Sequence, residues 1–254
     1  RPAVVLFHGG GWSSGSYTGF VKHTDYLVSR GLVVFRIQYR LLKKKEPQIP
    51  NICTQDARSA MRYVRAHASR FGVDPAKLIS MGGSAGGQLA AAVAIENGLD
   101  DDQDDLSVSS KPQAMVLFNP VLDLIGEVEK RGASLTQKQR QVYGSICPND
   151  HLSHSTPPSV IFFGEEDKLL PHGTNFSKLA SQFNVRSDLH LYPGVGHTFW
   201  RRAGFDDELI YVLDEFLGSL GYLEGPPTIR RPTSEEMGKA TAQERARTST
   251  GSTE

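Results

Sequence analysis

Short apolar segments alternate with longer amphipathic segments over the first 220 residues. The apolar segments are rich in β-branched and bulky side chains, which is typical of buried strands. They predict strands at 2–7, 32–37, 77–81, 114–118 and 160–163, and the alternating pattern of 188–192 predicts a further strand. The segments between them predict helices at 18–30, 51–71, 88–95, 172–183 and 206–220. Strands that alternate with helices predict an α/β fold, in which helices cover both faces of a mostly parallel sheet.

The apolar period ends after Gly221. Gly225-Pro226-Pro227 is followed by a tail rich in Thr, Ser, Glu and Arg, which shows neither a helical nor a strand period. We therefore predict one folded domain over residues 1–223 and a disordered tail over 224–254. Within the domain, the polar segment at about 120–158 is predicted to be an insertion that forms a short lid or side wall.

Composition is consistent with one enzyme-sized domain. The chain has 254 residues, of which 39% are hydrophobic, so it can bury a substantial core. Its 28 basic and 28 acidic residues cancel, so no overall field attracts nucleic acid or an anionic bilayer, and no apolar run approaches membrane-spanning length. We expect neither kind of partner. Cys53 and Cys147 are compatible with two free thiols or one disulfide, which leaves the cellular compartment open.

The motif Gly82-Gly83-Ser84-Ala85-Gly86 lies between a predicted strand and a predicted helix. A serine in such a tight turn has an exposed hydroxyl close to a helix N-terminus, so Ser84 is the candidate nucleophile. The alternatives are a plain glycine-rich turn or a phosphate-binding loop. A Walker loop needs a lysine where Gln88 stands, and Ser84 and Ala85 interrupt the dinucleotide fingerprint.

A second glycine cluster, His8-Gly9-Gly10-Gly11-Trp12, follows the predicted strand 2–7. Ligands bind at the carboxyl ends of the strands in open α/β sheets. Successive glycines allow amide N–H groups to face an anion, so we predict that Gly10, Gly11 and Ala85 donate to an oxyanion. The alternative is an ordinary flexible loop.

Base and acid candidates follow later strands. His197 comes after the predicted strand 188–192, and Asp167 after the predicted strand 160–163. The chain order Ser, Asp, His is that expected for an α/β-hydrolase. Asp123 is the competing acid, because this fold can take its carboxylate from an earlier strand. Glu165 and Glu166 are weaker competitors, better explained as solvated loop charges.

In these motifs the chain resembles α/β-hydrolases of the esterase and lipase group related to hormone-sensitive lipase, and most closely bacterial carbohydrate esterases of the acetyl-xylan and feruloyl type. The matching segments are 8–12, 39–41, 56–60, 82–87, 164–171 and 196–197. The resemblance implies an α/β-hydrolase catalytic domain and a serine ester hydrolase that acts on small or carbohydrate-linked esters, with acetyl or feruloyl groups. The same machinery in relatives also cleaves amides or peptides, and some relatives are catalytically silent binding scaffolds.

Relatives also carry one or two antiparallel strands, and often a secretory signal, before the strand that corresponds to 2–7. The resemblance therefore implies that edge strands preceding Arg1 are missing, and it leaves a secreted or periplasmic location open. Oligomeric state is not predicted.

Four aromatic residues flank the predicted site. Trp12, Tyr17, Phe199 and Trp200 are candidates for stacking on a sugar or an aromatic acyl group, although core packing is the more common role of such residues.

Two further clusters have a metal-like composition. One consists of Cys147, His151 and His154, and the other is the acidic run at 100–105. The first has no fourth ligand nearby and the second does not have the EF-hand pattern, so we expect no metal and no cofactor.

Overall fold

The protein is described by a computed structural model that covers residues 1–43, 49–96, 98–130, 132 and 134–249. Six strands form one sheet in the order β2-β1-β3-β4-β5-β6, and all neighbouring strands are parallel. The strands are β1 Ala3–Phe7, β2 Val33–Ile37, β3 Leu78–Gly83, β4 Ala114–Phe118, β5 Ser159–Gly164 and β6 Ser187–Tyr192. The predicted α/β fold class is confirmed.

The four central strands explain the apolar runs of the sequence. Every residue of β1, β3, β4 and β5 is buried, because helices cover both faces of the sheet. The register pairs Phe7 with Gly82 and Gly83 with Phe118, so the carboxyl ends of β1, β3 and β4 lie at one edge. The segments that follow these strands therefore meet at that edge.

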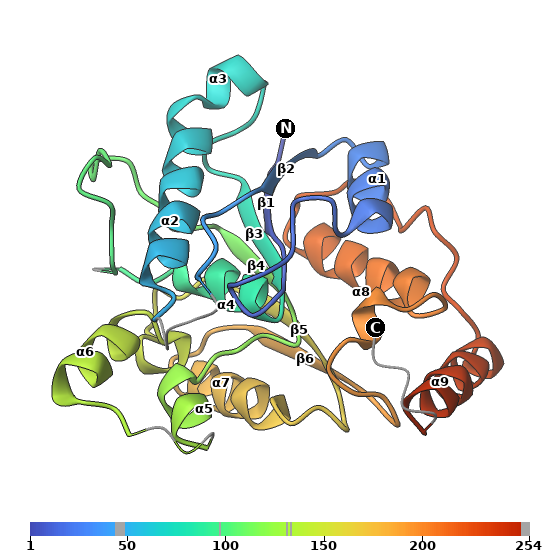
Figure 1. Cartoon of the computed structure of the whole chain (residues 1–254). Helices are drawn as coiled ribbons and strands as arrows, with labels where there is room; N and C mark the ends of the chain where they lie inside the picture. Colours follow the sequence, from blue (N-terminus) through green and yellow to red (C-terminus); the bar gives the residue numbers. More distant parts are fainter. Residues whose placement is uncertain (44–48, 97, 131, 133, 250–254) are drawn as a thin grey trace.

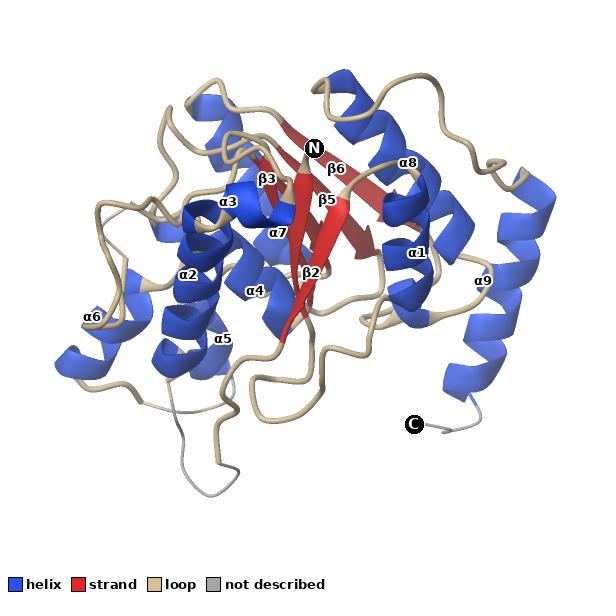
Figure 2. Ribbon diagram, turned by 90° about the horizontal axis from the view of Figure 1, so that it is seen from above, coloured by secondary structure: helices blue, strands red, loops and turns tan. Residues whose placement is uncertain are grey.

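Two groups of helices enclose the sheet, one on each face (Figures 1 and 2). One face is covered by α2 Asn51–Ala66, α3 Ala68–Phe71, α4 Ala85–Ala92 and α7 Leu170–Gln182. The other is covered by α1 Val21–Ser29 and α8 Asp206–Ser219. Their apolar sides form two core clusters separated by the sheet. None of the described helices is long and apolar enough to cross a membrane.

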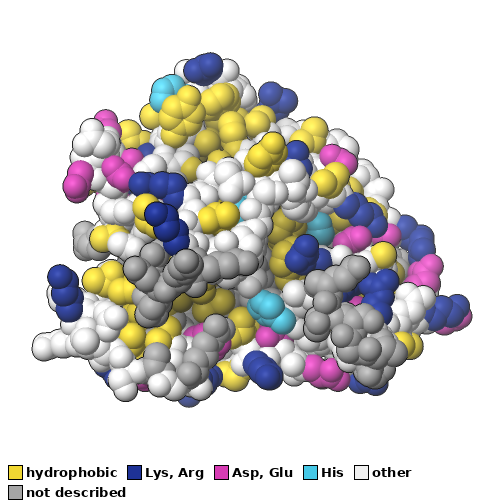
Figure 3. Space-filling view, viewed as in Figure 1, with side chains coloured by type: hydrophobic (Ala, Val, Ile, Leu, Met, Phe, Trp, Pro, Cys, Tyr) yellow, Lys and Arg dark blue, Asp and Glu magenta, His cyan; other side chains and the backbone are white. Residues whose placement is uncertain are grey.

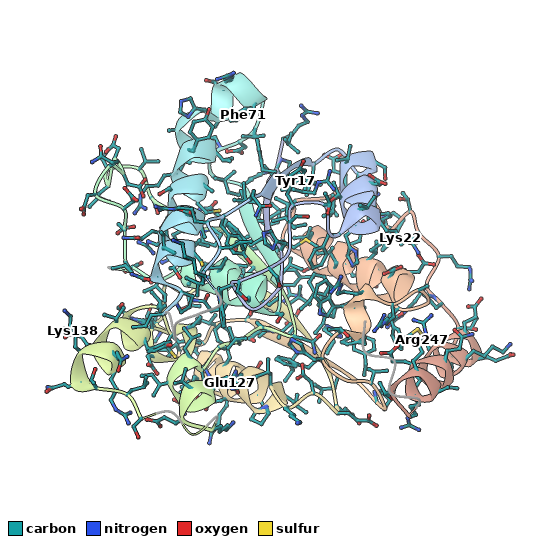
Figure 4. All side chains as sticks on the ribbon, in the orientation of Figure 1. Tyr17, Lys22, Phe71, Glu127, Lys138 and Arg247 are labelled. Atoms are coloured by element: carbon teal, nitrogen blue, oxygen red, sulfur yellow. The ribbon has the colours of Figure 1, made fainter. Side chains whose placement is uncertain are left out.

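The predicted insertion contains two helices, α5 Leu124–Lys130 and α6 Gln137–Ser145, followed by a short 3₁₀ turn at Pro148–Asp150. Helix α6 begins with a capping box in which Thr136 accepts from the Gln139 amide. Figure 4 shows Glu127 on α5 and Lys138 on α6, far from Lys22 on α1. The insertion therefore lies away from the α1 side of the molecule.

The prediction that the tail is disordered is wrong for a large part of it. Helix α9 spans Ser234–Ser249. Met237 and Ala240 pack against the core cluster under α8, and Arg231 forms an ion pair with Glu208 at 2.7 Å. Met237 and Ala240 are too few to give the sequence of α9 a clear helical period. Contacts with the rest of the fold stabilise this helix. The boundary of the catalytic domain at residue 223 stays a prediction.

Charged side chains of both signs intermix over the region of α9, whereas hydrophobic side chains gather around α3 at the opposite end of the same face (Figure 3). Cys53 and Cys147 are both free and buried, which decides between the two alternatives left open by the sequence. Burial raises the pKa of each thiol to about 12, so both stay protonated at neutral pH.

Candidate active site

Ser84 occupies a tight turn between β3 and α4. Its backbone lies at φ 56° and ψ −119°, a conformation that non-glycine residues rarely adopt, and its amide donates to the Phe118 carbonyl at 2.8 Å. A Cβ at Gly82 would lie 2.1 Å from the Gly86 carbonyl oxygen, and one at Gly86 would lie 2.1 Å from the Phe7 carbonyl oxygen. The two glycines of the motif are therefore needed for the close approach of strand and helix.

Three predicted side chains form a hydrogen-bonded relay. The Ser84 Oγ lies 2.8 Å from Nε2 of His197, and Nδ1 of His197 lies 2.9 Å from Oδ2 of Asp167. A carboxylate only accepts, so Nδ1 carries the proton and donates to Asp167. Nε2 is then free to accept the proton of the Ser84 hydroxyl. The structure thus brings together residues 84, 167 and 197 in the arrangement of a nucleophile, a base and an orienting acid.

Asp167 is held as a carboxylate although it is buried. Burial raises its pKa, but hydrogen bonds from His197, the Leu169 amide and the Asn119 side chain outweigh burial, so that the pKa lies below its usual value. Asn119 was missed in the sequence. It is fully buried, has a φ of 44°, and directly follows β4 at the carboxyl edge. A polar residue at the end of a buried strand is the signal that would have found it.

The competing acids lie elsewhere. Asp123 caps the start of α5, where its Oδ1 accepts from the Gly126 amide at 2.8 Å. The Glu166 carboxylate lies 3.8 Å from the Arg245 guanidinium, at the surface. Of the carboxylates in the described structure, it is Asp167 that contacts His197.

The glycine loop after β1 faces the same site. Gly10 and Gly11 have φ values of 123° and 57°, and a Cβ at Gly10 would lie 2.2 Å from the Ser14 carbonyl oxygen. Within the described residues, no hydrogen bond uses the amide N–H of Gly10 or Gly11. Ala85 is the first residue of α4, and its N–H has no acceptor within the helix. These three amides are therefore available to an anion beside Ser84.

Side chains behind the loop hold it in place. The Tyr39 hydroxyl donates to the His8 carbonyl at 2.8 Å, and the two rings stack with centroids 4.2 Å apart. The His8 Nδ1 donates to the Gly9 carbonyl at 2.8 Å. Burial lowers the pKa of His8, which keeps its imidazole neutral.

A cavity of about 780 Å³ opens beside Ser84 and His197. Its wall combines hydroxyl groups, a few charges and aromatic rings, contributed by residues 8–11, 14–16, 18–23, 84, 197–198, 200–201 and 206. No described residue of the insertion lines this cavity, so the segment predicted as a lid or side wall does not form its wall. The wall is formed instead mainly by the segment that runs from His8 into the first turn of α1 and by the loop after β6.

One of the four aromatic candidates contributes to this lining. Trp200 lines the cavity and stacks on Phe20 with centroids 4.6 Å apart. Phe199 is fully buried and packs against Tyr192 and Phe205. Trp12 and the exposed Tyr17 are also outside the described lining.

The metal-like clusters have other partners. The acidic run is neutralised by arginines of α2, with Arg62 Nη1 lying 2.7 Å from Asp100 and 2.9 Å from Asp104. His151 and His154 bond to the carbonyls of Gly144 and Phe183. Among the described residues, no three His, Cys, Asp or Glu side chains are grouped as ligands for a metal ion.

A parallel sheet that carries a serine, histidine and aspartate relay at its carboxyl edge defines the class of α/β-hydrolases. A family model described as BD-FAE matches residues 1–180, and the chain belongs to this family.

Several relatives and solved structures that the chain is similar to are named as esterases. The chain is 27% identical over 233 residues to the acetylxylan esterase of Xylanibacter ruminicola, covering 86% of the chain and 45% of that protein. It is 36% identical to the versiconal hemiacetal acetate esterase of Dothistroma septosporum, covering 87% and 73%. The apo structure of Thermogutta terrifontis esterase 2 superimposes with a TM-score of 0.78 at 33% identity, covering 89% of this chain and 85% of that one.

The chain spans about half the length of the acetylxylan esterase and of the probable isoprenylcysteine methylesterase of Arabidopsis thaliana that it also matches. Together the comparisons support carboxylic ester hydrolysis as the chemistry of this fold and site.

Proposed function

We propose that this chain is a serine carboxylic-ester hydrolase that works through an acyl-enzyme. The observation that carries this proposal is the unbroken relay from Ser84 through His197 to Asp167, in a cavity shared with the glycine loop. A relay of this kind lowers the cost of generating a serine alkoxide at neutral pH.

We assign each step of the proposed mechanism to groups that lie beside Ser84. As the Ser84 Oγ attacks the ester carbonyl carbon, His197 Nε2 accepts its proton, and Asp167 stabilises the imidazolium that forms. The amides of Gly10, Gly11 and Ala85 donate to the oxyanion of the tetrahedral intermediate. When this intermediate collapses, the alcohol leaves with the proton from His197. Water activated by His197 then hydrolyses the acyl-enzyme and restores the serine.

We infer that the substrates are small or carbohydrate-linked esters, with acetyl or feruloyl groups. Three observations support this substrate class. Ser14, Ser16, Thr18 and Thr198 line the cavity with hydroxyl groups, and Trp200 adds an aromatic face. Three of the relatives are named for the hydrolysis of acetylxylan or of an acetate ester. Structures of the Thermogutta esterase are described with bound propionate and butyrate, which are short acyl products.

Pre-steady-state hydrolysis of p-nitrophenyl acetate by the full chain tests the mechanism. We expect a burst of about one equivalent of nitrophenol per active site, absent in Ser84→Ala and unchanged by a chelator. In that variant, turnover should fall by at least about 10³-fold. Retention of more than a few per cent of activity by folded Ser84→Ala would exclude Ser84 as the nucleophile.

The proposed substrate class is tested separately, with a panel of substrates. Acetylated and feruloylated sugars are compared with matched amides and with long-chain esters, as kcat/KM values. Preference for an amide over the corresponding ester would contradict the substrate proposal while leaving the relay intact.

A further inference from the structure

The glycine loop passes through an unusual backbone conformation. Gly10, Gly11 and Trp12 have successive φ values of 123°, 57° and 59°. Glycine adopts positive φ readily, but a tryptophan does so only where its surroundings hold it. Trp12 therefore marks the point at which the loop is held in place from outside.

The Trp12 carbonyl accepts from the Leu42 amide at 2.8 Å, and the Trp12 side chain is held by α4. Its indole Nε1 donates to Oε1 of Gln88 at 3.0 Å, and Nε2 of Gln88 donates to the Ile146 carbonyl at 3.0 Å. Gln88 is fully buried and lies one helical turn after Ser84, whose carbonyl accepts from the Gln88 amide at 3.1 Å. One buried side chain thus connects the glycine loop, the nucleophile helix and the insertion.

The chemistry of the two partners allows only one orientation of this amide. An indole N–H only donates and a backbone carbonyl only accepts, so the side-chain oxygen of Gln88 must face Trp12 and its nitrogen must face Ile146. Both ends are satisfied in a site without exposure to solvent, where an unpaired polar group is costly. Rotation of the amide by half a turn would break both bonds.

We propose that Gln88 is a positioning residue for the oxyanion site: oriented by the Ile146 carbonyl, it fixes Trp12 and thereby the amide donors of Gly10 and Gly11. This inference rests on the proposed esterase function. Backbone donors stabilise an oxyanion only if they point at it before the reaction, and Gly10 and Gly11 have no side chains of their own to enforce that direction. The insertion, although absent from the described cavity wall, contributes to the site through this contact.

The effect of losing this contact should be confined to the transition state. The donors meet a full negative charge only after Ser84 has attacked, so a displaced loop weakens the intermediate more than the bound ester. We therefore expect a lower kcat with little change in KM. A role limited to stability would change neither constant in the folded protein.

Gln88→Met tests this expectation in the full chain, because methionine has a similar length and no hydrogen-bonding amide. We expect kcat for p-nitrophenyl acetate to fall by about 10- to 100-fold with KM within about twofold. The affinity for a trifluoromethyl ketone, which forms a tetrahedral adduct with the serine, should fall by a similar factor.

Ser80→Ala is the matched control. Ser80 is fully buried in β3, and its hydroxyl donates to the Ala90 carbonyl of α4 at 2.6 Å without touching the loop. It removes a buried hydrogen bond from the same strand and helix, so the melting temperature should fall while kcat stays within about twofold.

Trp12→Phe provides a second test that does not depend on the folding of the Gln88 variant. It removes the indole donor together with part of the ring while keeping an aromatic side chain, and it should lower kcat alone, as Gln88→Met does. If the two residues act as one unit, the double variant should be little worse than either single one. Retained kcat in both single variants, a loss confined to KM, or additive losses would each overturn the proposal. A normal wild-type burst in the same series would show that the esterase mechanism itself still stands.

Discussion

The two sides of Ser84 are held in place in different ways. On one side, the His197 side chain hydrogen-bonds to the Ser84 hydroxyl at 2.8 Å and to the Asp167 carboxylate at 2.9 Å. On the other side, the glycine loop offers only backbone amides, and Tyr39 and Gln88 hold it from behind. A side chain can take part in the reaction and also form the hydrogen bonds that hold it in position. A backbone donor depends on residues that take no part in the reaction.

This difference predicts two patterns of sensitivity. Removal of a relay residue abolishes a chemical step, whereas removal of a residue behind the loop displaces donors by a fraction of an ångström and lowers the rate in a graded way. Three substitutions and one deletion test this difference between the two sides.

The largest effect is expected for Asp167→Asn. An amide at this position no longer stabilises the imidazolium and favours the wrong histidine tautomer, so kcat at neutral pH should fall by about 10³- to 10⁴-fold. Steady-state kinetics with p-nitrophenyl acetate measures the loss. Asp123→Asn is the control and should stay within about threefold of wild type. A larger loss for Asp123 than for Asp167 would reassign the acid.

Asn119→Ala should have an intermediate effect and a distinct pH signature. Asn119 donates to the Asp167 carboxylate and helps to hold its pKa below the usual value. Without that donor the pKa of Asp167 rises, so the carboxylate becomes protonated at a higher pH on acidification. We expect kcat to fall about tenfold at neutral pH and the acid limb of the kcat/KM profile to move to higher pH. An unshifted acid limb would show that Asn119 acts only on packing.

Tyr39→Phe should show the graded response of the loop side. It keeps the ring that stacks on His8 but leaves the His8 carbonyl without its hydroxyl donor. We expect kcat to fall by about three- to tenfold, with a loss of about 1 kcal/mol in the free energy of unfolding. Kinetics and urea denaturation on the same preparation separate the two effects. A loss as large as that of Asp167→Asn would remove the distinction between the two sides.

The smallest effect on rate is expected from deletion of residues 224–254. Helix α9 packs Met237 on the core, and Arg245 Nε of this helix donates to the carbonyl of Gly194, in the loop that carries His197, at 3.4 Å. The free energy of unfolding should fall by about 2 kcal/mol while kcat stays within about twofold. A kcat loss above tenfold in the folded, truncated chain would show that the relay side also depends on remote support.

The sequence alone was sufficient for the features that local chemistry controls. The apolar runs predicted the four central strands, because a strand buried on both faces has few polar positions. The short apolar run of β2 and the alternating pattern of β6 predicted the two edge strands. The tight turn around Ser84 was predictable because Gly82 and Gly86 are needed wherever a strand and a helix approach so closely. The order Ser84, Asp167, His197 suggested which residues the structure would bring together.

Only the tertiary structure decided which residues support that site and which line it. Asn119, Tyr39 and Gln88 are ordinary polar residues in the sequence, and their importance comes from partners 31 to 76 positions away. The cavity wall formed by two distant loops, and helix α9 on its narrow apolar stripe, depend on long-range contacts in the same way. The local sequence pattern indicates which secondary structure a residue favours. Only the folded chain brings residues that are distant in the sequence within hydrogen-bonding distance of each other.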